Sequence, residues 1–478
     1  MSIDYFAILP QIILVLAGMV ILLLEPLTAP GRKGLLGQIA VVASFLAACA
    51  LSFQPLGRSQ ASFHGMFLAD NFSFTFQWLF YIITGVCALI ALHFNEREGT
   101  QRGEYYALLL FACSGMSLMA ASGDLILTFL GIEILSIATY ILAGFKRTDA
   151  KSNESAVKYF LLGSFATAFL LYGIALIYGS TGTTNYDAIR QIASLQGVPQ
   201  VTLILGLGLL LIGFGFKIAT VPFHAWAPDV YEGAPTAVTA FMIVGPKAAG
   251  FAALVRILVQ ALPSLQADWN TILWASAILT MTVGNIVATR QSNIKRMLAY
   301  SAIAHAGYIL IGIVANSVAG YRAVVFYLIV YTAMNLGALS VILSLSGRGD
   351  RRVDLEDFSG LGRIQPLAAA ALSLFLISLA GIPLTGGFIG KFHLFSAAVQ
   401  KGYIGLAIVG VLNSVVSVYY YFRVMVFMYM KEPKEADAEP IPAPTLAVIA
   451  IAAASIVWLG ISPNSILNLA SRSILLLQ

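Results

Sequence analysis

Charged residues are scarce in this sequence. Only 10% of its 478 residues are Asp, Glu, Lys or Arg, whereas a typical soluble domain has about 25%. Hydrophobic residues make up 59% of the chain, and the polar linkers that separate soluble domains are missing. These absences exclude a soluble multidomain protein.

Cysteine is rarer still. Cys49, Cys87 and Cys113 lie far apart in the sequence and form no CxxC or other metal-ligating spacing. This excludes an iron–sulfur cluster or a zinc site built from them. We interpret the three cysteines as small apolar packing residues and predict no metal on this chain.

Apolar runs of roughly 20 residues recur along the whole length, and each could cross a hydrocarbon core of about 30 Å as a helix. The sequence therefore predicts an all-α polytopic membrane protein. The first span follows Asp4 without a basic region and precedes no small-residue cleavage site, so we expect a retained helix, not a signal peptide. We predict about fourteen spans, at 5–25, 34–53, 73–94, 104–120, 124–145, 155–178, 200–222, 236–260, 271–289, 298–315, 321–345, 366–398 (long and interrupted), 404–430 and 443–462.

Basic residues in the loops predict the orientation, because cytoplasmic loops carry an excess of Lys and Arg. The odd-numbered loops, counted along the chain, hold most of them, and we expect these loops to be cytoplasmic. Both termini are then expected on the opposite side. Even-numbered loops and the tails hold only Arg58, Arg190, Arg322, Lys401 and Arg472.

A few charged residues fall within the predicted spans. Glu133, Lys247 and Lys391 lie so deep that their side chains cannot easily reach the interface, and Lys217 lies nearer the end of its span. Charges at such depth are expensive, so they mark functional sites. Lys158 lies one turn inside its span, a position that is equally consistent with a functional role and with anchoring at the membrane interface. For Arg256 and Arg423, near span ends, we expect interface anchoring.

Lysine is the informative residue type here. Burial disfavours the charged form of an amine, so a lysine in a low dielectric can exchange its proton near neutral pH. A neighbouring carboxylate restores the charged form, whereas arginine stays charged throughout. One glutamate with several lysines suits a switchable proton relay. A sodium path would instead call for several carboxylates or carbonyls.

Three histidines could assist such a relay, although a lone buried histidine is more often a satisfied core residue. His224 follows Pro222, His305 lies inside the tenth span, and His393 follows Lys391 by two residues.

Two segments should interrupt their helices, because proline removes a backbone donor and glycine tolerates unwinding. One runs from Lys217 through Pro222 to Pro235, and the other runs from Gly381 through Pro383 to Lys391. Irregular backbone at membrane depth is tolerated only within protein or beside a hydrated cavity.

These breaks fall in spans seven and twelve, five helices apart. Because five is odd, a duplicated five-helix unit comes out inverted across the membrane, as in transporters with paired interrupted helices. The predicted organisation is a three-helix segment at 1–100, a first repeat at 101–262, an inverted second repeat at 263–432 and a final helix at 433–478.

Several motifs carry a family resemblance over about residues 70–430. They are Gly131-Ile-Glu133-Ile-Leu-Ser136, the Lys217-to-Pro235 block, Gly245-Pro246-Lys247, and Lys295-Arg296-Met-Leu-Ala-Tyr300-Ser301 with His305. The sequence resembles the antiporter-like membrane subunits of respiratory complex I and of multi-subunit cation/proton antiporters. The Gly381–Lys391 run and the end of the chain after span fourteen make it most similar to the subunit N group of NADH–quinone oxidoreductases.

The resemblance implies roles for individual residues. Glu133 would pair with Lys217, Lys158 would modulate them, Lys247 would transfer protons centrally and Lys391 would be the terminal site. From their positions in the spans and breaks, we also expect His224, His305, Pro222 and Pro383 to support the relay.

It also implies a setting for the chain. This is a bacterial inner (plasma) membrane with periplasmic termini, where the chain contacts other complex I membrane subunits, lipid and protons but no nucleic acid. No cofactor is expected on this chain, with FMN, iron–sulfur clusters, NADH and quinone bound by other subunits. The alternatives are a subunit of a sodium/proton antiporter, or a structural membrane spacer.

Overall fold

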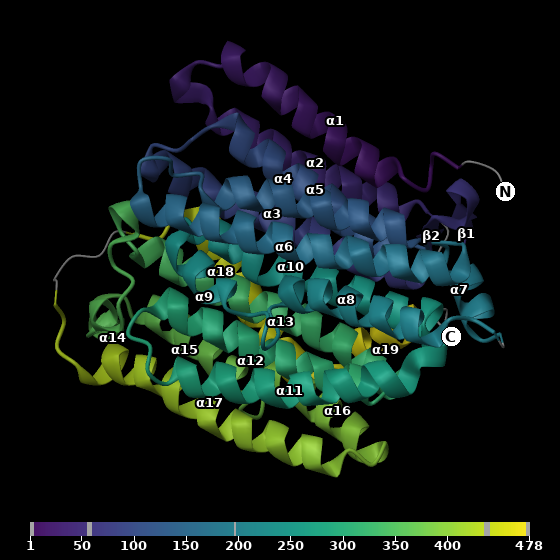
Figure 1. Cartoon of the computed structure of the whole chain (residues 1–478). Helices are drawn as coiled ribbons and strands as arrows, with labels where there is room; N and C mark the ends of the chain where they lie inside the picture. Colours follow the sequence, from purple (N-terminus) through teal and green to yellow (C-terminus); the bar gives the residue numbers. More distant parts are fainter. Residues whose placement is uncertain (1–3, 55–59, 196, 435–439, 475–478) are drawn as a thin grey trace.

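The computed structural model describes residues 4–54, 60–195, 197–434 and 440–474, which form one bundle of helices that run along a common direction (Figure 1). Arg58 and parts of the predicted 433–478 segment lie outside these ranges. The α-helices are α1 Leu9–Leu24, α2 Gly34–Ser52, α3 Asn71–Glu98, α4 Gly103–Ala121, α5 Leu125–Ala143, α6 Ala150–Thr181, α7 Tyr186–Ala193, α8 Gln200–Ile218, α9 Trp226–Gly233, α10 Thr236–Arg256, α11 Gln266–Ala288, α12 Ile294–Val314, α13 Val318–Leu345, α14 Leu361–Ile364, α15 Pro366–Ala380, α16 Gly386–Gln400, α17 Ile404–Met430, α18 Ala443–Ile461 and α19 Asn464–Ile474.

Within the described ranges, thirteen helical segments are long and apolar enough to cross a membrane. Each coincides with a predicted span. The predicted twelfth span, 366–398, is formed instead by the two shorter helices α15 and α16. The all-α polytopic class is therefore confirmed, while the count of fourteen crossings, the inverted repeats and the four-part division remain predictions.

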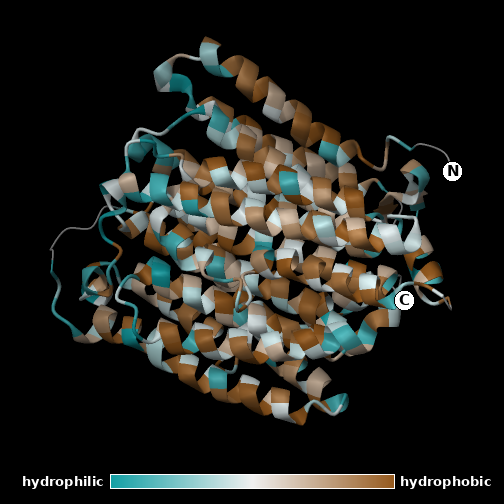
Figure 2. Cartoon of the chain, in the orientation of Figure 1, coloured by the Kyte–Doolittle hydropathy of each residue, from teal (hydrophilic) through white to brown (hydrophobic). Residues whose placement is uncertain are grey.

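Burial is unequal across the bundle. The α10 and α12 helices are almost completely enclosed, and α10 packs against α3, α4, α8 and α13. The α1, α6 and α18 helices leave most of their apolar surface uncovered. Hydrophobic residues predominate along the helices, whereas hydrophilic residues gather at the two ends of the bundle (Figure 2). A helix that is apolar all round belongs in such a core or in lipid.

The two ends of the bundle differ. One end carries α7 and a small antiparallel hairpin of β1 (Gln60–Ser62) and β2 (Phe67–Ala69), none of which the sequence patterns predicted (Figure 1). The α14 helix lies at the opposite end, together with the described residues of the odd-numbered loops (Figure 1). The first described residues and α19 lie at the hairpin end.

Arg256 is not the interface anchor that its position predicted. Its guanidinium forms two 2.8 Å hydrogen bonds with the carboxylate of Asp70, and neither side chain is exposed by more than 2%. Asp70 also caps α3 through a capping box with Ser73. The expectation failed because tertiary packing places an acid beside the arginine, which sequence depth does not reveal.

Arg423 is partly buried. It donates to the backbone carbonyls of Thr289 and Gln291.

Candidate functional site

Both predicted helix breaks are present. The α8 helix ends at Ile218, where Ala219 adopts a left-handed conformation with φ 57°, and α9 begins at Trp226. The α15 helix ends at Ala380. Each break leaves the last carbonyls of a helix without the intrahelical partners that a continuous helix would supply.

Glycines shape the second break. Gly381 has φ 84°, and α16 begins at Gly386. Pro222 and Pro383 lie in the two breaks, as predicted, and both are exposed on the surface of this chain.

Lys217, near the end of α8, is 6% exposed. Its ammonium donates a 2.9 Å hydrogen bond to the Ser136 hydroxyl. The carboxylate of Glu133, on the same helix as Ser136, accepts a 2.9 Å hydrogen bond from Thr167. No direct ion pair within the described residues joins Glu133 to Lys217, but the two charges lie near enough to interact electrostatically, so the pairing implied by the resemblance stays a prediction. Packing instead places a serine, three residues after Glu133, against the lysine.

Lys247 is fully enclosed in the middle of α10. Its ammonium donates to the backbone carbonyl of Ala302 on α12 and lies 5.7 Å from the ring centroid of Tyr331. The side chain therefore points from the first half of the chain into the second, which suits a group that passes protons between them.

Lys391, on α16, is 3% exposed and lies against the end of α15. Its ammonium is 3.0 Å from the carbonyl oxygens of both Leu379 and Ala380, and 4.6 Å from the ring centroid of Tyr308. These carbonyls belong to the last turn of a helix, whose dipole favours a cation. The break thus creates a cation-binding position inside the bundle.

His305 is buried on α12, and both Lys247 and Lys391 lie near enough to interact with it electrostatically. Its Nδ1 lies 2.6 Å from the Tyr327 hydroxyl and its Nε2 lies 3.1 Å from the Tyr421 hydroxyl. The Tyr421 hydroxyl also hydrogen-bonds Ser301. Both ring nitrogens therefore have hydroxyl partners that can give or accept a proton.

The other two histidines are less enclosed. His224 and His393 are both half-buried, and the Nδ1 atom of His224 is buried without a hydrogen-bond partner among the described residues.

Lys158 lies away from this interior chain of groups. Its side chain is 41% exposed and pairs with Glu154 at 2.6 Å and Asp229 at 2.8 Å. It is nine residues, roughly 13 Å of helix rise, from the Thr167 that binds Glu133. Acidic residues at the odd-loop end of the bundle hold Lys158, while the neighbouring Tyr159 stacks on Phe216, the residue before Lys217, with ring centroids 6.4 Å apart. The modulating role that the resemblance implied for Lys158 stays a prediction.

An open pocket lined by Lys158, Asp229, Glu232 and Arg296 lies at this end. Arg296 bridges two of its acids, at 2.7 Å from Asp229 and 2.9 Å from Glu232. Burial alone would raise the pKa of the Asp229 carboxyl, but hydrogen bonds from Lys158 and Arg296 lower it below its ordinary value.

Sequence reasoning missed the hydroxyl partners. Ser301 and Ser136 stand within quoted motifs, but Tyr327 and Tyr421 carry no motif signal. A tyrosine in an apolar helix usually reads as packing surface, and only its buried hydroxyl, which needs a partner, could have drawn attention to it.

The sequence of this chain is similar to those of known membrane proteins. Residues 122–417 match the family described as NADH:quinone oxidoreductase/Mrp antiporter, TM. The NADH-quinone oxidoreductase subunit N of Trichlorobacter lovleyi is 49% identical over 425 residues, covering 89% of this chain and 87% of that protein.

Two solved structures have the same fold. A chain of respiratory complex I from Thermus thermophilus with bound aureothin is 34% identical, with a TM-score of 0.82, and the match covers 97% of this chain and 100% of that one. A chain of the Mrp complex from Dietzia sp. DQ12-45-1b has a TM-score of 0.85 at 21% identity, covering 98% and 97%, which shows the shared fold alone.

The chain therefore belongs to the NADH:quinone oxidoreductase/Mrp antiporter family of transmembrane subunits. It is a multi-pass membrane protein. The predicted similarity to the subunit N group of NADH–quinone oxidoreductases is confirmed.

Proposed function

We propose that this chain translocates protons as a membrane subunit of a complex I-type NADH–quinone oxidoreductase. Its relatives of the subunit N group and its family membership support this proposal. In the proposed complex, NADH, FMN, iron–sulfur clusters and quinone are bound by other subunits, and the redox chemistry takes place there. This chain contributes proton carriers alone.

One observation carries the proposal. Lys217, Lys247 and Lys391 are all buried, and none of them forms an ion pair within the described residues. Their ammonium groups donate hydrogen bonds to neutral oxygen atoms, which stabilise the charged form less than a carboxylate would. Such amines change protonation state when a nearby charge changes.

The proposed order begins at Glu133. A charge change near Glu133 alters the protonation of Lys217, and Lys247 then exchanges a proton with its surroundings. His305 connects Lys247 to Lys391 by accepting a proton at one ring nitrogen and releasing one from the other, through the Tyr327 and Tyr421 hydroxyls.

The odd-numbered loops face the cytoplasm in this proposal, and both termini lie on the periplasmic side of a bacterial inner membrane. The basic residues of these loops support that orientation. Lys158 belongs to the cytoplasmic end and modulates the pathway from there through Asp229.

NADH-driven proton uptake into vesicles containing the purified complex tests the proposal. We expect Glu133→Ala, Lys217→Ala, Lys247→Ala and Lys391→Ala to lower uptake at normal assembly, while the exposed Lys401→Ala serves as the matched control. Full proton uptake by all four variants would show that this chain is a structural membrane spacer. Sodium-dependent antiport by a preparation without flavin and iron would favour the sodium/proton antiporter.

A further inference from the structure

The helix that carries Lys247 has no capping side chain of its own. The residue before α10 is Pro235, which makes no side-chain hydrogen bond to the helix. The cap comes from far along the chain. The Asp350 carboxylate accepts hydrogen bonds from the backbone nitrogen of Thr236 at 2.8 Å and from its hydroxyl at 2.7 Å. Asp350 thus serves as an external N-cap for α10.

The Asp350 carboxylate also contacts α12, the helix whose Ala302 carbonyl accepts the hydrogen bond from Lys247. Lys295, in the first turn of α12, is 2% exposed and lies 3.5 Å from Asp350. Its ammonium also donates a 2.7 Å hydrogen bond to the carbonyl of Ala234, just before α10. Asp350 therefore joins the beginnings of the two helices between which the Lys247–Ala302 contact is made.

The loop that presents Asp350 is itself fixed in place. Asp350 has φ 52°, a left-handed conformation uncommon outside glycine, and such backbone persists only where the surroundings hold it. The backbone nitrogen of Gly349 donates to both carboxylate oxygens of Glu98, at 3.0 and 2.9 Å. Lys146 in turn pairs with Glu98 at 2.9 Å.

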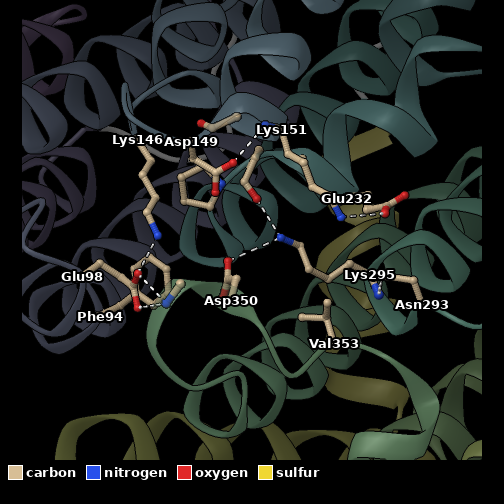
Figure 3. A pocket seen from close by; sticks show the side chains of 15 residues that line it. Phe94, Glu98, Lys146, Asp149, Lys151, Glu232, Asn293, Lys295, Asp350 and Val353 are labelled. Carbon is tan, nitrogen blue, oxygen red and sulfur yellow. Dashed lines mark hydrogen bonds and ion pairs between the residues drawn. The ribbon is translucent and has the colours of Figure 1, made fainter.

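Glu98, Lys146, Lys295 and Asp350 line a small open pocket at the odd-loop end, where Figure 3 shows Lys295 pointing toward Asp350 and Lys146 toward Glu98. The first half of the chain supplies Glu98, Lys146 and Thr236, and the second half supplies Lys295 and Asp350. The contacts thus connect the two halves at the level where both helices begin.

We propose that Asp350 and Lys295 are positioning residues for proton transfer through Lys247. Thr236 lies eleven residues, about 16 Å of helix rise, before Lys247, and Lys295 lies seven residues, about 10 Å, before Ala302. Both stretches are helical throughout, with Pro246 removing one backbone donor from α10, so fixing the two first turns restricts the alignment of the Lys247 ammonium on its acceptor. This inference rests on the proposed function, since the alignment matters only if Lys247 carries protons.

The test uses the complete complex in vesicles and measures protons taken up per NADH oxidised, with flavin content as the measure of assembly. We expect a several-fold loss of this ratio in Asp350→Ala and in Lys295→Met at unchanged flavin content. Asp350→Asn keeps an oxygen that can accept from Thr236, and Lys295→Arg keeps the charge, so both should retain most of the ratio. Glu356→Gln is the matched control, because it removes an exposed carboxylate downstream in the same α13–α14 connection.

Each result bears on the inference. Wild-type ratios in Asp350→Ala, or equal losses in Asp350→Ala and Asp350→Asn, would overturn it, because the cap would then be irrelevant. If Asp350→Ala does not assemble, the contrast between Lys295→Met and Lys295→Arg decides in the same way. If Lys247→Ala loses pumping while Asp350→Ala pumps fully, the positioning role of Asp350 is rejected but the proposed function is not. Full pumping in Lys247→Ala rejects the proposed function itself.

Discussion

The ammonium of Lys217 donates a 2.9 Å hydrogen bond to the hydroxyl of Ser136. The same hydroxyl donates to the Ile132 carbonyl within α5, so it is oriented to accept from the lysine. Residues three apart on a helix are neighbours, and Ser136 therefore stands one turn from Glu133. A neutral group, and not the carboxylate, makes the direct contact with the lysine.

We predict that Ser136→Ala impairs proton transfer at Lys217. A buried charged donor left without its partner loses roughly 1–3 kcal/mol, which disfavours the ammonium form. Proton uptake per NADH in vesicles should fall severalfold. Ser44→Ala is the matched control, because that hydroxyl bonds the Ala40 carbonyl of its own helix. Wild-type uptake in Ser136→Ala would contradict this account of Lys217.

Gly387→Ala should disrupt the second helix break. An added Cβ would lie 1.9 Å from the backbone oxygen of Ser378, which cannot move without shifting the end of α15. Overpacking of this kind typically costs about 1–3 kcal/mol and should displace the carbonyls that hold Lys391. We expect loss of both thermal stability and proton uptake.

Gly405→Ala provides the comparison, because no atom in the part of the chain that the structure describes lies within 4 Å of its added Cβ. It should leave stability unchanged or raise it by about 1 kcal/mol, since alanine is the better helix former. Equal melting temperatures for the two variants would show that the break tolerates a side chain.

Replacing either residue of the Arg256–Asp70 pair alone should strongly destabilise the folded protein. Removing one partner leaves the other charge buried and uncompensated, at a cost of about 3–5 kcal/mol. We expect Arg256→Met and Asp70→Ala each to lower the melting temperature and the amount of assembled protein, and the double variant to recover part of the loss. Arg363→Ala breaks an exposed pair with Glu432 and should change stability by less than about 1 kcal/mol. Additive losses in the double variant would argue against direct coupling.

Asp350 should make stability depend on pH. Burial alone would raise the pKa of its carboxyl, but the Lys295 ammonium and hydrogen bonds from Thr236 and Ser346 outweigh burial and hold the pKa below the ordinary 3.8. A depressed folded-state pKa contributes stability that is complete above the unfolded-state value and is lost as pH falls through the folded-state value.

Unfolding of wild type and Asp350→Asn at a series of pH values tests this sign. The wild-type advantage should be constant above about pH 5 and should shrink steadily as the pH falls below about 4. An advantage that grew toward acid would mean that the pKa is raised and that Lys295 does not stabilise the carboxylate.

Sequence alone determined the membrane class, the positions of the spans, the two helix breaks and the buried lysines. All of these follow from local composition: apolar runs of sufficient length become helices in lipid, and proline with glycine interrupts them. Depth within a span also predicted correctly that Lys247 and Lys391 are buried.

Tertiary structure alone decided which groups these residues meet. It placed Ser136 against Lys217, the α15 carbonyls against Lys391, Asp229 against Lys158 and Asp70 against Arg256. Each contact joins segments that are far apart along the chain or separated by a break, so helical periodicity carries no information about it. The partners of a buried charge are set by how the helices pack.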